Sequence, residues 1–148
     1  LVRSRGLGDV YKRQVTLESG GLEFIKGSHL WDIWYQPETF GKTSGHGEYE
    51  RNPDYVDIPD IEAKKEDYDI ISWDLMPGDV YAFQAMTVQG SGGNSRPDAR
   101  RRGYTVRYCG DDAVYDSRKG TQSHLRSDLH EDGDQLDSSQ YPLVWTKR

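Results

Sequence analysis

Residues 75–112 constrain the fold more than any other part of this 148-residue chain. They hold an alternating apolar run, VYAFQAMTV, a loop rich in Gly and Asn, QGSGGNSRPDA, and a second alternating run, RRGYTVRYC. Alternation with a period of two, in β-branched and aromatic residues, predicts a strand in each run. The Gly/Asn loop predicts the connection between the two strands. We therefore expect a mainly all-β domain.

Other segments add short strands to this pair. LEFI after Gly20-Gly21 predicts one strand, and YDIISWDL predicts another that ends at the turn MPGD, residues 76–79. We expect YDIISWDL and VYAFQAMTV to pair antiparallel, DDAVYD to extend the sheet, and YPLVW to form a last short strand or a docked tail. Short strands joined by Gly/Pro turns are typical of a β-sandwich or a jelly roll.

The first fourteen residues, LVRSRGLGDVYKRQ, show neither a helical nor a strand period. They resemble translated sequencing-adapter sequence rather than protein. We therefore expect residues 1–14 to be non-native and disordered, and residues 15–148 to form one domain. No stretch of the chain reaches the roughly 18 apolar residues that a membrane span needs, so no membrane partner is expected.

Charge and cysteine content narrow the choice of partners and compartment. The formal net charge is −6, and it becomes more negative without residues 1–14, which hold four basic residues and one acidic residue. A net acidic surface repels phosphate backbones, so nucleic acid is not an expected partner. The single Cys109 cannot form an internal disulfide, and this favours a reducing, cytoplasmic location.

Residues 31–67 form a long polar stretch with scattered aromatic side chains and one predicted helical turn, IEAKKE. Loops of this length in compact domains are usually functional lids or insertions. The aromatic side chains favour a lid that packs on something. Trp31 and Trp34 are candidates to cover a substrate, and ordinary packing explains them equally well.

The run Arg100-Arg101-Arg102 opens the last long strand. Because strand side chains alternate between faces, Arg101 shares a face with Thr105, whereas Arg102 lies on the other face. The three guanidinium groups therefore cannot act as one basic patch.

Four motifs, taken in order, resemble the phytanoyl-CoA dioxygenase family of Fe(II)/2-oxoglutarate-dependent oxygenases. They are GGLEFIKGSH (residues 20–29), Pro77-Gly78-Asp79, QGSGGN (residues 89–94), and Arg101 followed four residues later by Thr105. The resemblance covers residues 15 to about 145. It implies a double-stranded β-helix, the cupin-like jelly roll, with a long loop or lid insertion.

The resemblance also implies a site. Such oxygenases hold iron with two His and one carboxylate and leave positions open for 2-oxoglutarate and O₂. Gln89 stands at the metal ligand that is normally the second His. Arg101 and Thr105 would hold the far carboxylate of 2-oxoglutarate, with Arg100 as the alternative to Arg101 if the register differs by one. The reaction would hydroxylate a small organic or acyl substrate, and no residue is singled out as catalytic.

Two departures predict that this chain alone is inactive. The family's first metal pair, His-x-Asp, precedes the Gly-Ser-His strand, and residues 1–14 do not supply it. We therefore expect residues 15–148 to be the C-terminal portion of an incomplete jelly roll. Gln89 is the second departure, because a carboxamide is a weaker donor than imidazole. A genuine loss of iron, a read error and a dead gene copy all explain it.

The other His-x-carboxylate pairs, His46-x-Glu48 and His130-x-Asp132, lie after the Gly-Ser-His strand and match a pattern that chance produces easily. We interpret both as solvated loop residues. The alternative function is a non-catalytic jelly-roll binding module, or a pseudo-enzyme that keeps the fold for partner binding. The sequence indicates neither the substrate nor the oligomeric state.

Overall fold

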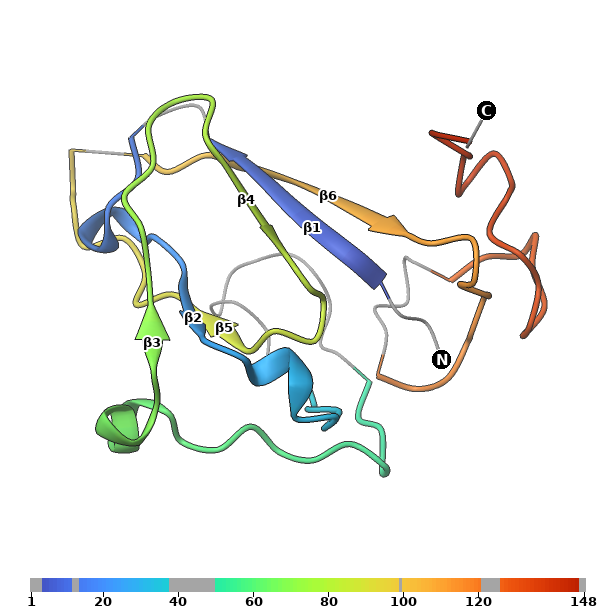
Figure 1. The fold of residues 1–148 in the computed structure, drawn as a ribbon, viewed down its shortest axis with the longest axis horizontal. Helices are drawn as coiled ribbons and strands as arrows, with labels where there is room; N and C mark the ends of the chain where they lie inside the picture. The colour runs from blue at the N-terminus through green and yellow to red at the C-terminus, as the bar shows by residue number, and fades with distance from the viewer. Residues whose placement is uncertain (1–3, 12–13, 38–49, 99, 121–125, 147–148) are drawn as a thin grey trace. The chain divides into compact units, whose positions relative to one another are not determined.

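The structure is a computed structural model, and it describes residues 4–11, 14–37, 50–98, 100–120 and 126–146. These residues form two compact units, and each is considered by itself. The strand unit consists of Ser4–Asp32 and Asp60–Tyr108. The loop unit consists of residues 33–59 and 109–148, as far as they are described. Figure 1 shows the strands and the loops that join them.

The strand unit contains two three-stranded sheets. The first has the order β4-β1-β6, from β4 (Val80–Phe83), β1 (Ser4–Tyr11) and β6 (Gly103–Cys109). The second has the order β3-β2-β5, from β3 (Ile70–Ile71), β2 (Glu23–Ile25) and β5 (Gln89–Gly90). β2 is antiparallel to both of its neighbours. Two sheets of short strands, with almost no helix, form the all-β jelly-roll type of fold predicted from the sequence.

Aromatic side chains connect the two sheets. The ring of Phe24 on β2 lies 5.2 Å from that of Tyr81 and 4.9 Å from that of Phe83, both on β4, in edge-to-face geometry. Such geometry is the favourable one for aromatic pairs. The buried cluster contains Val15, Leu22, Phe24, Leu75 and Tyr81. The sandwich interior therefore lies on the face of β2 that carries Phe24.

Three short 3₁₀ helices complete the elements: η1 (Leu17–Ser19), η2 (Ser28–Leu30) and η3 (Glu62–Asp67). The expected turn in IEAKKE corresponds to η3, and the expected strands LEFI and RRGYTVRYC correspond to β2 and β6. No helix among the described residues is long and apolar enough to cross a membrane.

Within residues 1–14, for which disorder is expected, residues 4–11 form β1 between β4 and β6. Leu7 is paired with Phe83 and Val10 with Val80 in antiparallel register. The physical reason is that strand pairing uses backbone groups, which every residue except proline supplies in full. A segment with a weak strand pattern can therefore still complete a sheet. The non-native origin of residues 1–14 stays a prediction.

The expected pairing of YDIISWDL with VYAFQAMTV is wrong. β3 pairs with β2, whereas β4 pairs with β1, so the two runs belong to different sheets. The turn at residues 76–79 does form, and its Asp79 N–H donates to the Met76 carbonyl at 3.0 Å. In a sandwich, such a turn can carry the chain from one sheet to the other instead of closing a hairpin.

Three further expectations about strands also fail within the described residues. VYAFQAMTV is not one strand, because β4 stops at Phe83 and a turn follows, in which Thr87 N–H donates to the Gln84 carbonyl. The segment DDAVYD does not extend a sheet, because its Val114 makes only an isolated bridge to Gln135. The segment YPLVW forms no strand, and Leu143, Val144 and Trp145 are exposed.

The central place of β1 makes its backbone testable. Because β1 has a neighbour on each side, each interior N–H faces one of them, and Gly8→Pro removes one donor from the sheet. We expect a loss of about 1–3 kcal/mol in the free energy of unfolding, the cost of leaving a buried acceptor unpaired. Urea unfolding followed by far-UV circular dichroism measures it.

Gly8→Ala is the matched control, since alanine keeps the N–H and favours a strand slightly more than glycine. Equal stability of the proline and alanine variants would show that residues 4–11 do not pair in solution.

Candidate cosubstrate and metal site

Gln89 lies on β5 directly opposite Phe24 of β2. In an antiparallel pair, directly opposed residues place their side chains on the same face of the sheet. Phe24 is buried against Tyr81 and Phe83, so the Gln89 side chain also points into the sandwich interior. Its Oε1 is shielded from solvent and has no hydrogen-bond partner among the described residues. Gln89 therefore presents an unsatisfied acceptor to the interior.

The loop after Gln89 is tied down at several points. Ser91 Oγ donates to the Gly20 carbonyl at 3.0 Å, and Ser95 N–H donates to the Glu18 carbonyl at 3.0 Å. Gly20 has a φ of +88°, and a Cβ there would lie 3.2 Å from the Gly93 carbonyl carbon. Glycine at position 20 thus permits both the left-handed turn and the close approach of the loop. Residues 91–96 thus belong to the connecting loop that the sequence predicts.

The arginine run lies just before β6, which begins at Gly103. Arg101 is half-buried and its Nε is shielded from solvent, whereas Arg100 and Arg102 are exposed. Thr105, which was expected to share the inward face with Arg101, is exposed. Among these four residues, Arg101 is thus the one that the strand unit partly encloses. We also expect Arg101 and Gln89 to converge inside the same mouth of the β-barrel, and this stays a prediction.

The two candidate substrate residues lie in different units and make different contacts. Trp34, in the loop unit, stacks on Tyr55 with ring centroids 5.7 Å apart, and the Arg118 guanidinium lies 5.6 Å from its ring centre. Trp31, in the strand unit, is partly exposed, and its ring lies 6.3 Å from that of Tyr68. Both contacts suit packing, and a role toward substrate stays a prediction for both.

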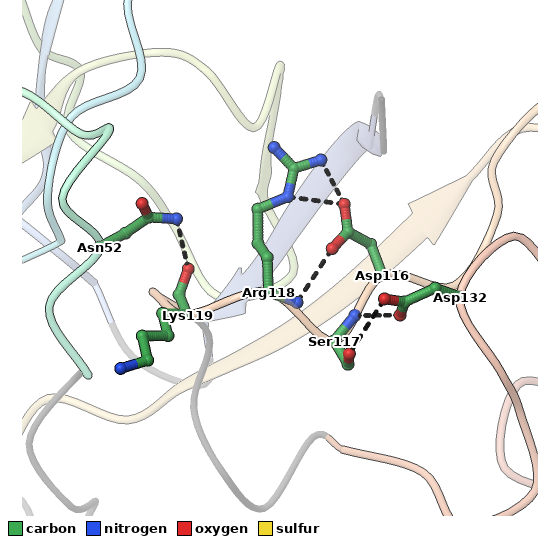
Figure 2. Close-up of polar contacts among 6 residues, drawn as sticks. All are labelled: Asn52, Asp116, Ser117, Arg118, Lys119 and Asp132. Carbon is green, nitrogen blue, oxygen red and sulfur yellow. Dashed lines mark hydrogen bonds and ion pairs between the residues drawn. The ribbon is translucent and has the colours of Figure 1, made fainter.

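The loop unit is organised around a buried amide that the sequence did not single out. Asn52 accepts from the Asp54 N–H, donates its own N–H to Gln36 Oε1 at 2.9 Å, and donates Nδ2–H to the Lys119 carbonyl at 2.7 Å. Figure 2 shows this last bond beside the turn at residues 116–119. Gly120 lies beside this contact, because its φ is +102° and a Cβ there would lie 2.6 Å from the Tyr55 ring and 3.3 Å from the Asn52 Cβ.

Charged groups of that turn serve local structure. Asp116 accepts hydrogen bonds from the Arg118 guanidinium, which lowers the pKa of that carboxyl. Asp132 accepts from the Ser117 N–H at 2.7 Å and from its hydroxyl at 3.2 Å (Figure 2). Burial raises the pKa of Tyr55. Asp116 is thus paired with Arg118 and Ser117 with Asp132, and these contacts stabilise the local backbone.

The residues described do not fit an iron centre. No group of three His, Cys, Asp or Glu side chains lies together among them. His29 is exposed on η2, and His130 is engaged with Ser127 Oγ at 2.8 Å from its Nδ1. His46 and His124 lie outside the described residues. Gln89 alone offers a donor at the expected place, and it is a neutral amide.

The unsatisfied acceptor leads to a stability prediction. Gln89→Met keeps the length of the side chain and removes the buried amide, so the free energy of unfolding should rise by about 1–3 kcal/mol. Urea unfolding followed by tryptophan fluorescence measures the change.

Gln84→Met serves as control, because Gln84 is exposed and its replacement should change stability by less than about 0.5 kcal/mol. A loss of stability in Gln89→Met would mean that the amide makes favourable contacts in the folded protein.

Comparisons with known proteins bear on the family and the fold. The family model of phytanoyl-CoA dioxygenase (PhyH) matches residues 10–103. No curated protein matches the sequence. Among solved structures, the non-heme alpha ketoglutarate dependent carbocyclase SnoK from nogalamycin biosynthesis is similar with a TM-score of 0.67 and 24% identity, over 97% of this chain and 51% of that chain.

The non-heme alpha ketoglutarate dependent epimerase SnoN from nogalamycin biosynthesis is similar with a TM-score of 0.62 and 21% identity, over 97% of this chain and 50% of that chain. The chain thus spans about half the length of both structures. These likenesses show a shared fold. The family model matches more than half of this chain, so the chain belongs to the phytanoyl-CoA dioxygenase family.

Proposed function

We propose that residues 15–148 are the C-terminal portion of an Fe(II)/2-oxoglutarate-dependent dioxygenase domain, and that this chain by itself carries out no turnover. The observation that carries the proposal is the inward-facing amide of Gln89, whose Oε1 is buried and unsatisfied among the described residues. It stands where the family holds a metal ligand. An interior polar atom without a partner is expected at a functional site rather than in a core.

Arg101 is the group proposed to bind the cosubstrate. 2-Oxoglutarate carries two carboxylates, and a guanidinium can hold one of them through two parallel hydrogen bonds. The partial burial of Arg101 supports this assignment, because a shielded charge attracts a carboxylate more strongly than an exposed one does. Thr105 is the proposed helper of Arg101, and its exposure gives it less support.

Iron would supply the oxidising chemistry of a complete domain, in which 2-oxoglutarate and O₂ are consumed while a small organic or acyl substrate is hydroxylated. Gln89 is a neutral donor, and the described residues hold no cluster of stronger ligands. This set does not fit the metal, so the proposal for the chain stops at binding of the carboxylate cosubstrate. Trp31, partly exposed in the strand unit, is the better placed of the two proposed substrate contacts.

Cosubstrate binding can be tested without iron. We expect Arg101→Gln to weaken 2-oxoglutarate binding by about 10-fold to 100-fold, since a charge-assisted hydrogen bond contributes about 1.5–3 kcal/mol. Isothermal titration calorimetry of the full chain measures the affinity. Arg102→Gln is the matched control, because it removes a neighbouring exposed charge and should leave the affinity within about twofold.

Arg100→Gln tests the alternative register. If it weakens binding and Arg101→Gln does not, the clamp is Arg100. If neither variant changes the affinity, or the chain does not bind 2-oxoglutarate, the cosubstrate assignment fails.

Turnover gives a separate test. With Fe(II), 2-oxoglutarate and O₂, the chain should release succinate no faster than a protein-free blank, because metal affinity falls when an imidazole is replaced by an amide. In a version lengthened by the coding sequence upstream of Val15, Gln89→His should raise Fe(II) affinity markedly. A titration curve unchanged by Gln89→His would contradict the ligand position.

A non-catalytic jelly-roll binding module is the second candidate function. The observation in its favour is the neutral amide at position 89, which such a module explains without any loss of activity. The upstream reading frame separates the two: a His-x-Asp pair ahead of Val15 supports the oxygenase. Its absence from a complete frame supports the module.

A further inference from the structure

Ser28 makes a buried connection between two segments that lie 60 residues apart in the sequence. It is the first residue of η2 and only 3% exposed. Its Oγ donates, at 2.8 Å, to the carbonyl of Ile25, the last residue of β2. The same oxygen accepts the Val88 N–H at 2.9 Å, immediately before β5. One hydroxyl therefore joins the end of β2 to the start of β5.

We propose that Ser28 is a positioning residue that turns the side chain of Gln89 into the sandwich interior. Val88 is held through both of its backbone polar groups, because its carbonyl also accepts the Ile25 N–H at 3.0 Å. Gln89 follows directly. With Val88 fixed on both sides, the backbone at position 89 has one register against Phe24.

The register needs such a fixing contact because β5 has only two residues. A slip of a single residue would reverse the face of every side chain in the strand and turn Gln89 outward. The neighbouring segments supply the other constraint, since Ser91 Oγ donates to the Gly20 carbonyl at 3.0 Å. Ser28 and Ser91 thus fix the chain just before and just after β5.

The turn between β2 and η2 also explains why Ser28, a small hydroxyl residue, follows Gly27. Gly27 has a φ of +77°, and a Cβ added there would meet nothing within 4 Å. Glycine is therefore favoured at position 27 by the left-handed backbone and not by lack of space. The turn brings the Ser28 Oγ back onto the Ile25 carbonyl, where alanine would leave a buried donor and a buried acceptor unpaired.

The test introduces a thiol at the positioned residue. Gln89→Cys is made together with Cys109→Ser, because Cys109 is exposed and would react first. The rate of modification by a soluble disulfide reagent then reports how well position 89 is shielded. Adding Ser28→Ala should raise that rate at least about tenfold, whereas Ser28→Thr, which keeps the hydroxyl, should restore the slow rate.

A control separates positioning from general loss of stability. Val15→Ala removes packing from the core, at a residue 1% exposed, without touching β5. Under native conditions it should leave the thiol rate within about twofold of the parent. If Val15→Ala and Ser28→Ala accelerate the reaction equally, or if the parent thiol is already as reactive as Cys109, the positioning role is refuted.

Amide hydrogen exchange in the otherwise unchanged chain gives a second readout. Ser28→Ala should speed exchange at the Val88 amide by about tenfold or more, while the Leu75 amide, bonded to the Val15 carbonyl at 2.9 Å, keeps its protection. Unchanged protection at Val88 would overturn the proposal. This inference concerns the group assigned under the proposed function, yet neither readout uses iron or 2-oxoglutarate, so either proposal can fail while the other stands.

Discussion

The pairing of Phe24 with Gln89 is the contact on which the rest of the site depends. Phe24 defines the interior, because its ring meets Tyr81 and Phe83 of the other sheet. Gln89 is placed directly opposite it on the neighbouring strand. The packing of three aromatic rings therefore decides where an amide oxygen points. The hydrophobic contact provides the direction, and the backbone hydrogen bonds of β2 and β5 provide the register.

Local patterns in the sequence predicted the elements that form without distant partners. LEFI gave β2, RRGYTVRYC gave β6, and MPGD gave the turn, since each depends on propensity or turn chemistry within a few residues. The inward face did not follow from alternation in the same way. Arg101 lies just before β6, and within β6 Val106 is the half-buried residue, whereas Thr105 is exposed.

Partners distant in sequence could not be predicted in this way. Alternation shows that residues 80–83 form a strand, but it does not show that the strand pairs with β1 and not with residues 70–71. The same limit applies to Asn52, whose amide reaches the carbonyl of Lys119, 67 residues away. Such contacts depend on where the whole chain brings its segments, which single-residue preferences do not encode.

Within the loop unit, polar and stacking contacts replace the strands. Asp116 accepts from the Arg118 guanidinium, and the Asn52 side chain satisfies two backbone groups. The Trp34 ring contacts both Tyr55 and Arg118. These contacts order aromatic side chains that the sequence alone assigned equally to packing or to a lid. Because its ring contacts both of these residues, Trp34 packs within this unit.

The buried Oε1 of Gln89, which has no hydrogen-bond partner among the described residues, costs the fold stability. A buried acceptor without a partner costs about 1–3 kcal/mol, a sizeable part of the 5–15 kcal/mol that typically stabilises a domain. An apolar residue at position 89 would avoid that cost and would satisfy the core equally well. Instead, the hydrogen bonds of Ser28 and Ser91 fix the backbone so that the polar side chain of Gln89 faces inward. A polar group that is both costly and held in place is better explained by what it contacts in function than by what it adds to folding.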